Sequence, residues 1–380
     1  MRNASAGSRS ARQSNIELLR IFAMIAIIAN HSVVHGHVLY PPDTISVNRL
    51  WFQLIQIPGF CGVDAFVLIS GFFLVSARSL KTTRIVKLWA QIFFYSVLLY
   101  IVFVAAGAVP FSLRTLIARL TPVTSCRWWF ASTYFVLYLL SPFLNRLLNA
   151  FDKKQYLGFL AMLFLLWCVI PTLEGTLFQS FELFQNNHLA WFVFLYALGA
   201  FLRRFPAETG QSGARLIALS VLCMLAVFLT AVVLDVLGRR NPVFAQHALF
   251  LADLQTIPSL ISAVLLFLGF SRLDIGSRKA VNFLSSAMFG VYLIHDDTYV
   301  SPFLWERLFR SAAYAESPLF IPRSLLVIAA VFAVCTLIEL ARIRLIEKPC
   351  MPLIEGLARR IDRLGDALLS GRILGRFGRE

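Results

Sequence analysis

Long apolar runs separated by short polar or basic stretches make up most of the chain. Ten of these runs approach or exceed the length of about 20 apolar residues that a helix needs to cross the hydrocarbon core of a bilayer. The run at 281–297 is short and contains Ser and Gly, so it departs most from the pattern. The pattern predicts an all-α, polytopic integral membrane bundle of about 10 transmembrane helices, at residues 16–34, 58–77, 85–106, 128–148, 156–172, 188–204, 214–237, 250–270, 281–297 and 319–341.

The composition of the 380-residue chain agrees with this pattern. Hydrophobic residues make up 58% and charged residues only 14%, whereas about a quarter of the residues of a soluble domain are charged. The first apolar run is long enough to remain in the membrane as a span, so we expect no cleavable signal peptide. The six Cys show no paired spacing, which favours buried free thiols over disulfides or a metal cluster. We expect no metal cofactor.

The distribution of basic residues predicts the orientation. With a cytoplasmic N-terminus, 25 Lys and Arg fall in cytoplasmic segments and nine in outer segments, which is the bias expected of cytoplasmic loops. Both termini are therefore expected in the cytoplasm. The net charge of +15 reflects this topology, so we expect no nucleic-acid partner. The chain divides into a polar cytoplasmic N-terminus (1–14), a transmembrane domain (15–349) and a basic amphipathic tail (350–380), which either lies on the anionic inner leaflet or frays.

Arg20 and His31 stand out inside the first apolar run. They are eleven residues apart, which at about 100° per residue is three turns plus roughly 20°, so both point to one helix face. The same spacing separates them by about 16 Å along the helix axis. Two ionisable groups on one face of a membrane helix are costly unless they serve a buried polar path. The pair is therefore the first candidate for chemistry.

With the predicted orientation, several polar residues share the outer depth of the membrane. Gathered at one level they indicate a functional cavity, although side chains reaching to the outer interface, with Trp128 and Trp129 as belt residues, explain them too. Asp253 and Gln255 fit the interfacial explanation at least as well. A histidine among these residues suits acid–base work, because its proton is exchanged near neutral pH. The shared-depth set is Asn30, His31, Asp64, His295 and Asp296.

Other nucleophile patterns are missing or have a simple structural explanation. No G-x-S-x-G sequence is present, so a serine-nucleophile hydrolase gains no support. Ser70-Gly71 is typical of a small-residue contact between membrane helices.

The chain resembles the membrane-bound acyltransferase 3 family over about residues 14–349, nearly its whole length. Each motif is weak alone, and their order together with the number of spans makes the resemblance specific. The motifs are Glu17-Leu-Leu-Arg20 with ten residues before His31; Gly62-Val-Asp64-Ala-Phe with Ser70-Gly71 and a basic stretch ending at Arg84 and Lys87; Trp129-Phe130 leading to Tyr134 and Ser141-Pro142; Leu198-Gly199 with Arg203-Arg204; and Phe289-Gly290-Val-Tyr292-Leu-Ile-His295.

The resemblance implies an acyl-CoA donor, usually acetyl-CoA, that reaches the site from the cytoplasm. It implies that Arg20 and His31 are the essential pair, with His31 as general base or transient acyl carrier and Arg20 as a contact for the donor. Guanidinium groups suit CoA phosphates. A late acidic residue of the family corresponds to Glu347 or Glu339. Further site candidates are Asp64 and His295 for catalysis, and Arg84 and Lys87 for donor binding.

Trp-Phe in the fourth predicted span is similar to the branch that acetylates exopolysaccharide, enterobacterial antigen and similar glycans. The resemblance thus implies an O-acetyltransferase of the plasma or inner membrane that acts on a cell-surface or lipid-linked glycan. Two alternatives remain open from the residues: a transporter or flippase for glycans or lipid-linked sugars, and a non-catalytic membrane scaffold. The missing internal repeat argues against a transporter, and a scaffold would tolerate changes at Arg20 and His31.

Overall fold

The computed structural model describes residues 13–38, 40, 45–77, 79–177, 184, 187–206 and 210–369, and this part of the chain is helical without strands. Apolar runs rich in Leu, Ile, Phe and Ala form the longer helices. The elements, in chain order, are α1 (Ser14–Val34), α2 (Val47–Leu74), α3 (Thr82–Ala105), α4 (Leu113–Leu120), α5 (Trp129–Ala150), α6 (Lys153–Phe164), η1 (Leu165–Val169), α7 (Ile170–Leu177), α8 (His188–Arg204), α9 (Gly213–Gly238), α10 (Pro242–Gln246), α11 (Ile257–Ser271), α12 (Lys279–Ser285), α13 (Met288–His295), α14 (Val300–Pro302), η2 (Phe303–Leu308), η3 (Ser311–Tyr314), α15 (Phe320–Arg342), η4 (Ile343–Glu347) and α16 (Lys348–Leu369).

Within the described residues, six helical segments are long and apolar enough to cross a membrane. The all-α prediction is therefore confirmed, while the number of about ten spans and the cytoplasmic termini stay predictions. Two boundaries were wrong: the helix predicted from residue 58 begins at Val47, with Pro58 inside it, and the helix predicted from residue 250 begins at Ile257, after a stretch of turns. The predicted helix at 281–297 is broken into α12 and α13 by the Ser286–Ala287 turn.

Buried polar side chains explain the early start of α2. Arg49 donates from Nε and Nη2 to Asp235 on α9, at 2.9 Å and 2.6 Å, and Gln53 Nε2 donates to the same carboxylate at 2.7 Å. Because these groups are paired inside the protein, α2 extends through a stretch that hydropathy alone ends. The same contacts join the N-terminal part of α2 to the C-terminal part of α9.

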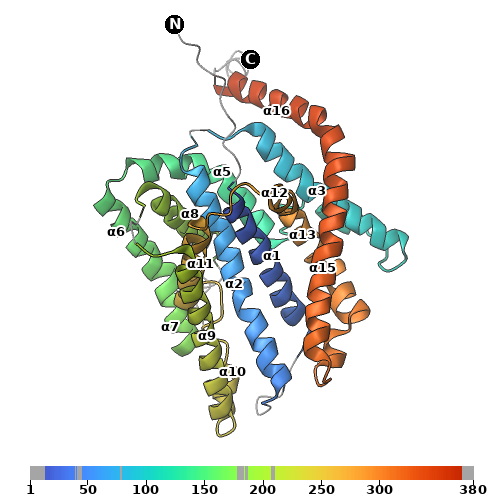
Figure 1. Cartoon of the computed structure of the whole chain (residues 1–380). Coiled ribbons are helices and arrows are strands. Elements are labelled where there is room, and N and C mark those ends of the chain that lie inside the picture. Colours follow the sequence, from blue (N-terminus) through green and yellow to red (C-terminus); the bar gives the residue numbers. More distant parts are fainter. Residues whose placement is uncertain are drawn as a thin grey trace.

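The centre of the bundle is built from α1, α2, α8 and α11, which cross closely (Figure 1). Glycines allow the close crossings: a Cβ atom on Gly71 would lie 2.0 Å from the Tyr196 carbonyl oxygen, and one on Gly199 would lie 2.2 Å from that of Leu68. Gly71 is thus a small-residue helix-packing site, as the Ser70-Gly71 pattern predicted. Tight packing here fixes the faces that α1 and α2 turn toward the site.

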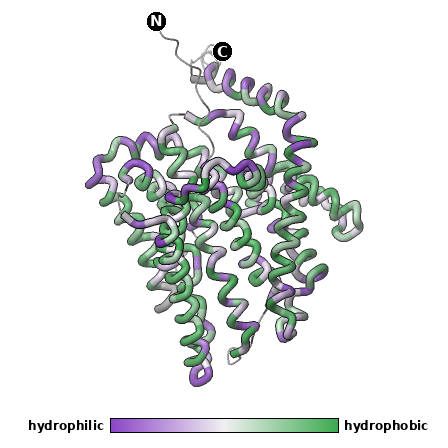
Figure 2. The backbone as a smooth tube through the Cα atoms, viewed as in Figure 1, coloured by the Kyte–Doolittle hydropathy of each residue, from purple (hydrophilic) through white to green (hydrophobic). Residues whose placement is uncertain are grey.

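Helix α15 runs through the π-helical turn η4 into α16, which bends over one end of the bundle (Figure 1). Helix α16 alternates hydrophilic and hydrophobic residues along its length (Figure 2). Its Asp362 carboxylate accepts a hydrogen bond from Thr82 at the start of α3. Residues 1–12 of the predicted N-terminal segment (1–14) and residues 370–380 of the predicted tail lie outside the described residues, and the contact of the tail with a leaflet stays a prediction.

Candidate active site

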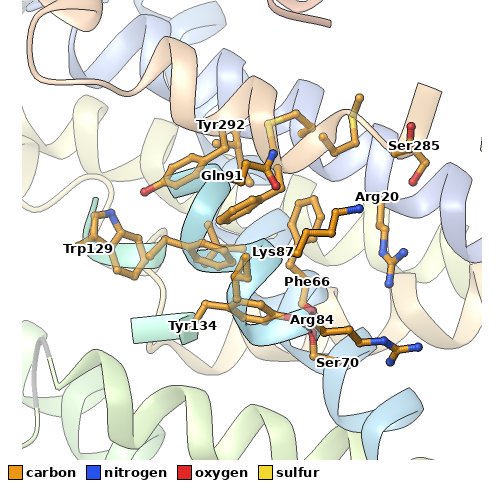
Figure 3. A pocket seen from close by; sticks show the side chains of 18 of the residues that line it. Arg20, Phe66, Ser70, Arg84, Lys87, Gln91, Trp129, Tyr134, Ser285 and Tyr292 are labelled. Carbon is orange, nitrogen blue, oxygen red and sulfur yellow. Dashed lines mark hydrogen bonds between the residues drawn. The ribbon is translucent and has the colours of Figure 1, made fainter. Parts of the chain in front are cut away.

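A cavity of about 320 Å³ lies between α1, α2, α3, α5 and the α12–α13 pair. Arg20, Arg84 and Ser285 lie at one end of it and Trp129 and Tyr292 at the other (Figure 3). Arg20 and His31, which the helical spacing places on one face of the first helix, therefore both line this cavity. The lining residues are Arg20, Met24, Ile27, His31, Val63, Phe66, Ser70, Arg84, Lys87, Leu88, Gln91, Trp129, Phe130, Tyr134, Ser285, Ser286, Met288, Phe289 and Tyr292.

Three cations line one end of the cavity. Arg20 Nη1 lies 3.1 Å from both carboxylate oxygens of Glu17, which also accepts a hydrogen bond from Ser285. Lys87 Nζ lies 2.5 Å from Glu347 Oε1. Among the described residues no carboxylate forms an ion pair with Arg84. The end near Arg20 is thus polar and carries net positive charge, which suits an anionic ligand.

Aromatic rings form the wall between the two ends. The Phe130 ring stacks on Tyr134 with centroids 5.9 Å apart, and meets Tyr292 edge-on at 5.5 Å. The Tyr134 hydroxyl lies 3.1 Å from Ser70 Oγ, which donates to the Phe66 carbonyl. The Tyr292 hydroxyl is buried beside the Asp296 carboxylate and the Phe130 backbone, but no described residue lies within hydrogen-bond distance of it. An unpaired buried hydroxyl is costly. The Tyr292 hydroxyl therefore marks a place where an acceptor atom of a ligand would complete a hydrogen bond.

Two histidines and an aspartate meet at the other end of α1. His295 Nδ1 lies 2.7 Å from the Val291 carbonyl oxygen. A carbonyl only accepts, so Nδ1 carries the proton of neutral His295 and Nε2 is an acceptor. His31 Nδ1 lies 3.1 Å from that Nε2 and 3.3 Å from Asp296 Oδ1. Both neighbours accept, so we assign the proton of neutral His31 to Nδ1.

The assignment leaves His31 Nε2 with a lone pair. His295 and Asp296 occupy the Nδ1 edge of the ring and do not line the cavity. The opposite edge, which carries Nε2, is therefore the part of His31 that remains for the cavity. A neutral imidazole held in this tautomer is able to accept a proton from a bound hydroxyl.

A buried ion pair fixes the segment that follows α13. Arg119 on α4 is fully buried and donates from Nη1 to Asp297 Oδ2 at 2.6 Å and from Nη2 to Thr298 Oγ1 at 2.6 Å. The Arg119 guanidinium also lies 4.6 Å from the centroid of the Tyr299 ring. Because Asp296 directly precedes Asp297, this pair holds the carboxylate that faces His31.

Asp64 lies outside the cavity. Its Oδ1 accepts a hydrogen bond from Trp191 Nε1 on α8 at 2.9 Å, and its side chain is fully buried between helices. The structure thus brings His31, His295 and Arg20 to the cavity or its edge and does not bring Asp64 there. Asp253 and Gln255 line a different cavity of about 330 Å³, beside His188 and away from His31.

One arginine, Arg342, joins the late acidic residues Glu339 and Glu347 to each other, and both glutamates contact residues that line the cavity. Arg342 donates from Nε and Nη2 to the two oxygens of Glu339, both at 2.8 Å, and from Nη2 to Glu347 at 2.6 Å. Glu339 accepts from Gln91 Nε2 at 2.9 Å, and Glu347 pairs with Lys87. Glu339 therefore contacts the cavity lining through Gln91, and Glu347 contacts it through Lys87.

Sequence reasoning left two residues without a role. Tyr292 belongs to the motif that ends at His295, and its unpaired hydroxyl is visible only in the folded chain. His35 Nε2 lies 3.2 Å from Asp296 Oδ1. The spacing of four residues from His31 was the available signal for His35, because residues four apart share a helix face.

Comparison with known proteins adds one match. A family model described as an acyltransferase domain, of the acyltransferase 3 family, matches residues 13–340. This range contains the whole lining of the cavity and the His31, His295 and Asp296 cluster. No curated protein and no solved structure matches the chain.

Proposed function

The chain belongs to the acyltransferase 3 family, and from this membership and the cavity we propose an integral membrane O-acyltransferase that uses acyl-CoA. The acyl group is acetyl in the simplest form of the proposal, and the acceptor is a hydroxyl of a cell-surface or lipid-linked glycan. The observation that carries the proposal is one cavity with a cationic end at Arg20 and a histidine with a free lone pair, His31, toward the other end.

The cationic end is the proposed donor site. CoA carries phosphates, and guanidinium groups bind phosphate oxygens in a planar, two-pronged geometry. Arg84 has no carboxylate partner among the described residues, so it is the cation best placed to take a phosphate. The distance of about 16 Å along α1 from Arg20 to His31 is comparable to the reach of an extended pantetheine arm. One donor molecule thus contacts the cations and presents its thioester near His31.

The proposed reaction is a direct transfer with His31 as general base. Nε2 of His31 takes the proton of the acceptor hydroxyl while the hydroxyl oxygen forms a bond to the thioester carbonyl carbon. The tetrahedral intermediate then collapses, the carbon–sulfur bond breaks, and the CoA thiolate leaves with the proton from His31. The carboxylate of Asp296, 3.3 Å from His31 Nδ1, stabilises the imidazolium that forms in between, as carboxylates do beside catalytic histidines.

The carbonyl oxygen of the thioester gains negative charge in this step and needs a donor. The Tyr292 hydroxyl lines the cavity, is buried and has no partner among the described residues. A hydrogen-bond donor that is already positioned for the developing negative charge needs little reorganisation of the site at the moment of reaction. We therefore assign Tyr292 as the donor to the oxyanion.

Tyr292→Phe should lower kcat by about 10²-fold, because loss of one oxyanion donor typically has an effect of this size. The KM for acetyl-CoA should change little, since the cations bind the donor. Steady-state kinetics of the purified protein separate the two quantities. Tyr134→Phe is the matched control, because the Tyr134 hydroxyl already has Ser70 Oγ as a neighbour at 3.1 Å. Equal losses in both variants would remove the role given to Tyr292.

The function itself is tested with protein reconstituted in vesicles, radiolabelled acetyl-CoA and glycan extracted from the source membrane. We expect the label to appear in the glycan as an alkali-labile ester, with unlabelled CoA as a competitor. Mass spectrometry of surface glycans from cells with and without the gene identifies the acceptor. Movement of glycan across the vesicle membrane without acetylation would instead support the transporter alternative and overturn the proposal.

A further inference from the structure

Three metal-binding atoms meet beside the cavity. His31, His35 and Asp296 each offer one ligand atom, and these three atoms all lie within 4.8 Å of one another. His31 Nδ1 is 3.3 Å from Asp296 Oδ1, and His35 Nε2 is 3.2 Å from the same oxygen. Two imidazoles and one carboxylate are a ligand set that Zn²⁺ uses in proteins. We propose that these three residues bind Zn²⁺ and that the bound ion inhibits acyl transfer.

The distances fit the ion. Zn²⁺ holds nitrogen and oxygen ligands at about 2.0–2.2 Å in a tetrahedron, so neighbouring ligand atoms are separated by roughly 3.3–3.5 Å. The separations of His31 Nδ1 and His35 Nε2 from Asp296 Oδ1 lie close to this range. All three ligand atoms lie within 4.8 Å of one another, so the two imidazoles approach each other by at most about 1.5 Å to bind the ion. Three protein ligands leave the fourth position for water, as in open zinc sites.

The surroundings favour binding at these three atoms over a simple hydrogen-bonded cluster. The i, i+4 spacing of His31 and His35 places both rings at the end of α1, where their rings lie edge-to-face with centroids 4.8 Å apart. The Asp296 carboxylate supplies one negative charge among the three ligands, which attracts the divalent ion. The His35 side chain is 40% exposed, whereas His31 is 15% exposed, so the ion reaches the site from the side of His35.

Binding would act on the reaction through the tautomer of His31. The ion takes the lone pair of Nδ1, so the single proton of neutral His31 moves to Nε2. The cavity-facing nitrogen then carries a proton and has no lone pair with which to accept one from a hydroxyl. This inhibitory part rests on the proposed function, whereas binding of the ion does not.

The binding is measured on the purified full-length protein, stripped with chelator, by equilibrium dialysis and titration calorimetry with ZnCl₂. We expect one site in the native protein and at least about 10-fold weaker binding in His35→Ala. The matched control is His37→Asn, because His37 is 69% exposed, pairs with Glu306 and is not a ligand. Asparagine tolerates the positive φ of 48° at this position. Weak or absent binding in the native protein, or equal affinity in His35→Ala, would overturn the proposed site.

The inhibition is measured with the same proteins in the acetyl-transfer assay. Micromolar ZnCl₂ should inhibit the native protein and His37→Asn, and chelator should reverse the inhibition. Measured against its own rate without the ion, His35→Ala should lose sensitivity to Zn²⁺ by at least about 10-fold. Loss of transfer after chelator, restored by Zn²⁺, would overturn the inhibitory role. If the protein shows no acyl transfer at all, the proposed function fails, and the dialysis result still decides whether the site exists.

Discussion

His31→Gln should lower the rate of acyl transfer by about 10²- to 10⁴-fold, which is the range for loss of a general acid–base group. Glutamine keeps a side-chain N–H donor for His295 and Asp296 but has no basic nitrogen for the cavity. The substitution therefore removes proton transfer while it disturbs the cluster little. The rate is measured with labelled acetyl-CoA at saturating donor and acceptor concentrations.

Two further measurements make the His31 result specific. Binding of CoA to His31→Gln, measured by calorimetry, should match the native protein, because Arg20, Arg84 and Lys87 form the opposite end of the cavity. His247→Gln is the control for a histidine substitution as such, since His247 is exposed on the turn after α10 and contacts the Val243 carbonyl. Native rates in His31→Gln at equal protein abundance would contradict the general-base role.

The fold shows what hydropathy predicts well and where it fails. Long apolar runs such as those of α1, α3 and α9 mark helices, since burial in lipid and the need to satisfy every backbone group leave few alternatives. Boundaries fail where polar side chains are paired inside the protein: α2 starts at Val47 because Arg49 and Gln53 share Asp235. Hydropathy does not record such pairing, which depends on a helix far away in the sequence.

In the candidate site, too, some placements follow from the sequence pattern and others do not. Helical periodicity alone places Arg20 and His31 on one face, and both line the cavity. Periodicity on α2 explains why Asp64 does not, because Val63, Phe66 and Ser70 line the cavity and Asp64 is about 100° away around the helix from Val63. Depth in the membrane was a poor guide here, since it gives the level of a side chain and not its direction.

The meeting of His31 with His295 and Asp296 depends on tertiary packing. Helix α13 is separated from α1 by more than 250 residues, and the carboxylate of Glu339 on α15 takes the space that a side chain at Gly290 would need. A Cβ atom on Gly290 would lie 2.1 Å from Glu339 Cδ. The motif that contains Gly290 and His295 therefore combines a close helix contact with a site residue, and only the structure separates the two roles.

Asp297→Ala should lower the free energy of unfolding by about 3–5 kcal/mol, because it leaves Arg119 buried without its carboxylate. The remaining contacts of Arg119, with Thr298 and the Tyr299 ring, are neutral and compensate little of a buried charge. Unfolding by denaturant in detergent micelles measures the loss. The rate of acyl transfer in the folded fraction should also fall, since Asp296 loses the anchor beside it.

A surface ion pair and a double substitution test whether the unpaired charge of Arg119 causes the loss of stability in Asp297→Ala. Glu306→Ala removes the partner of exposed His37 and should change stability by no more than about 1 kcal/mol. Arg119→Met combined with Asp297→Leu should recover most of the stability lost in Asp297→Ala, because apolar side chains in place of a buried ion pair leave no charge without a partner. Equal stability of Asp297→Ala and Glu306→Ala would show that the Arg119–Asp297 pair does not anchor the segment. Recovery of stability without recovery of transfer would show that the pair also orients Asp296 toward His31.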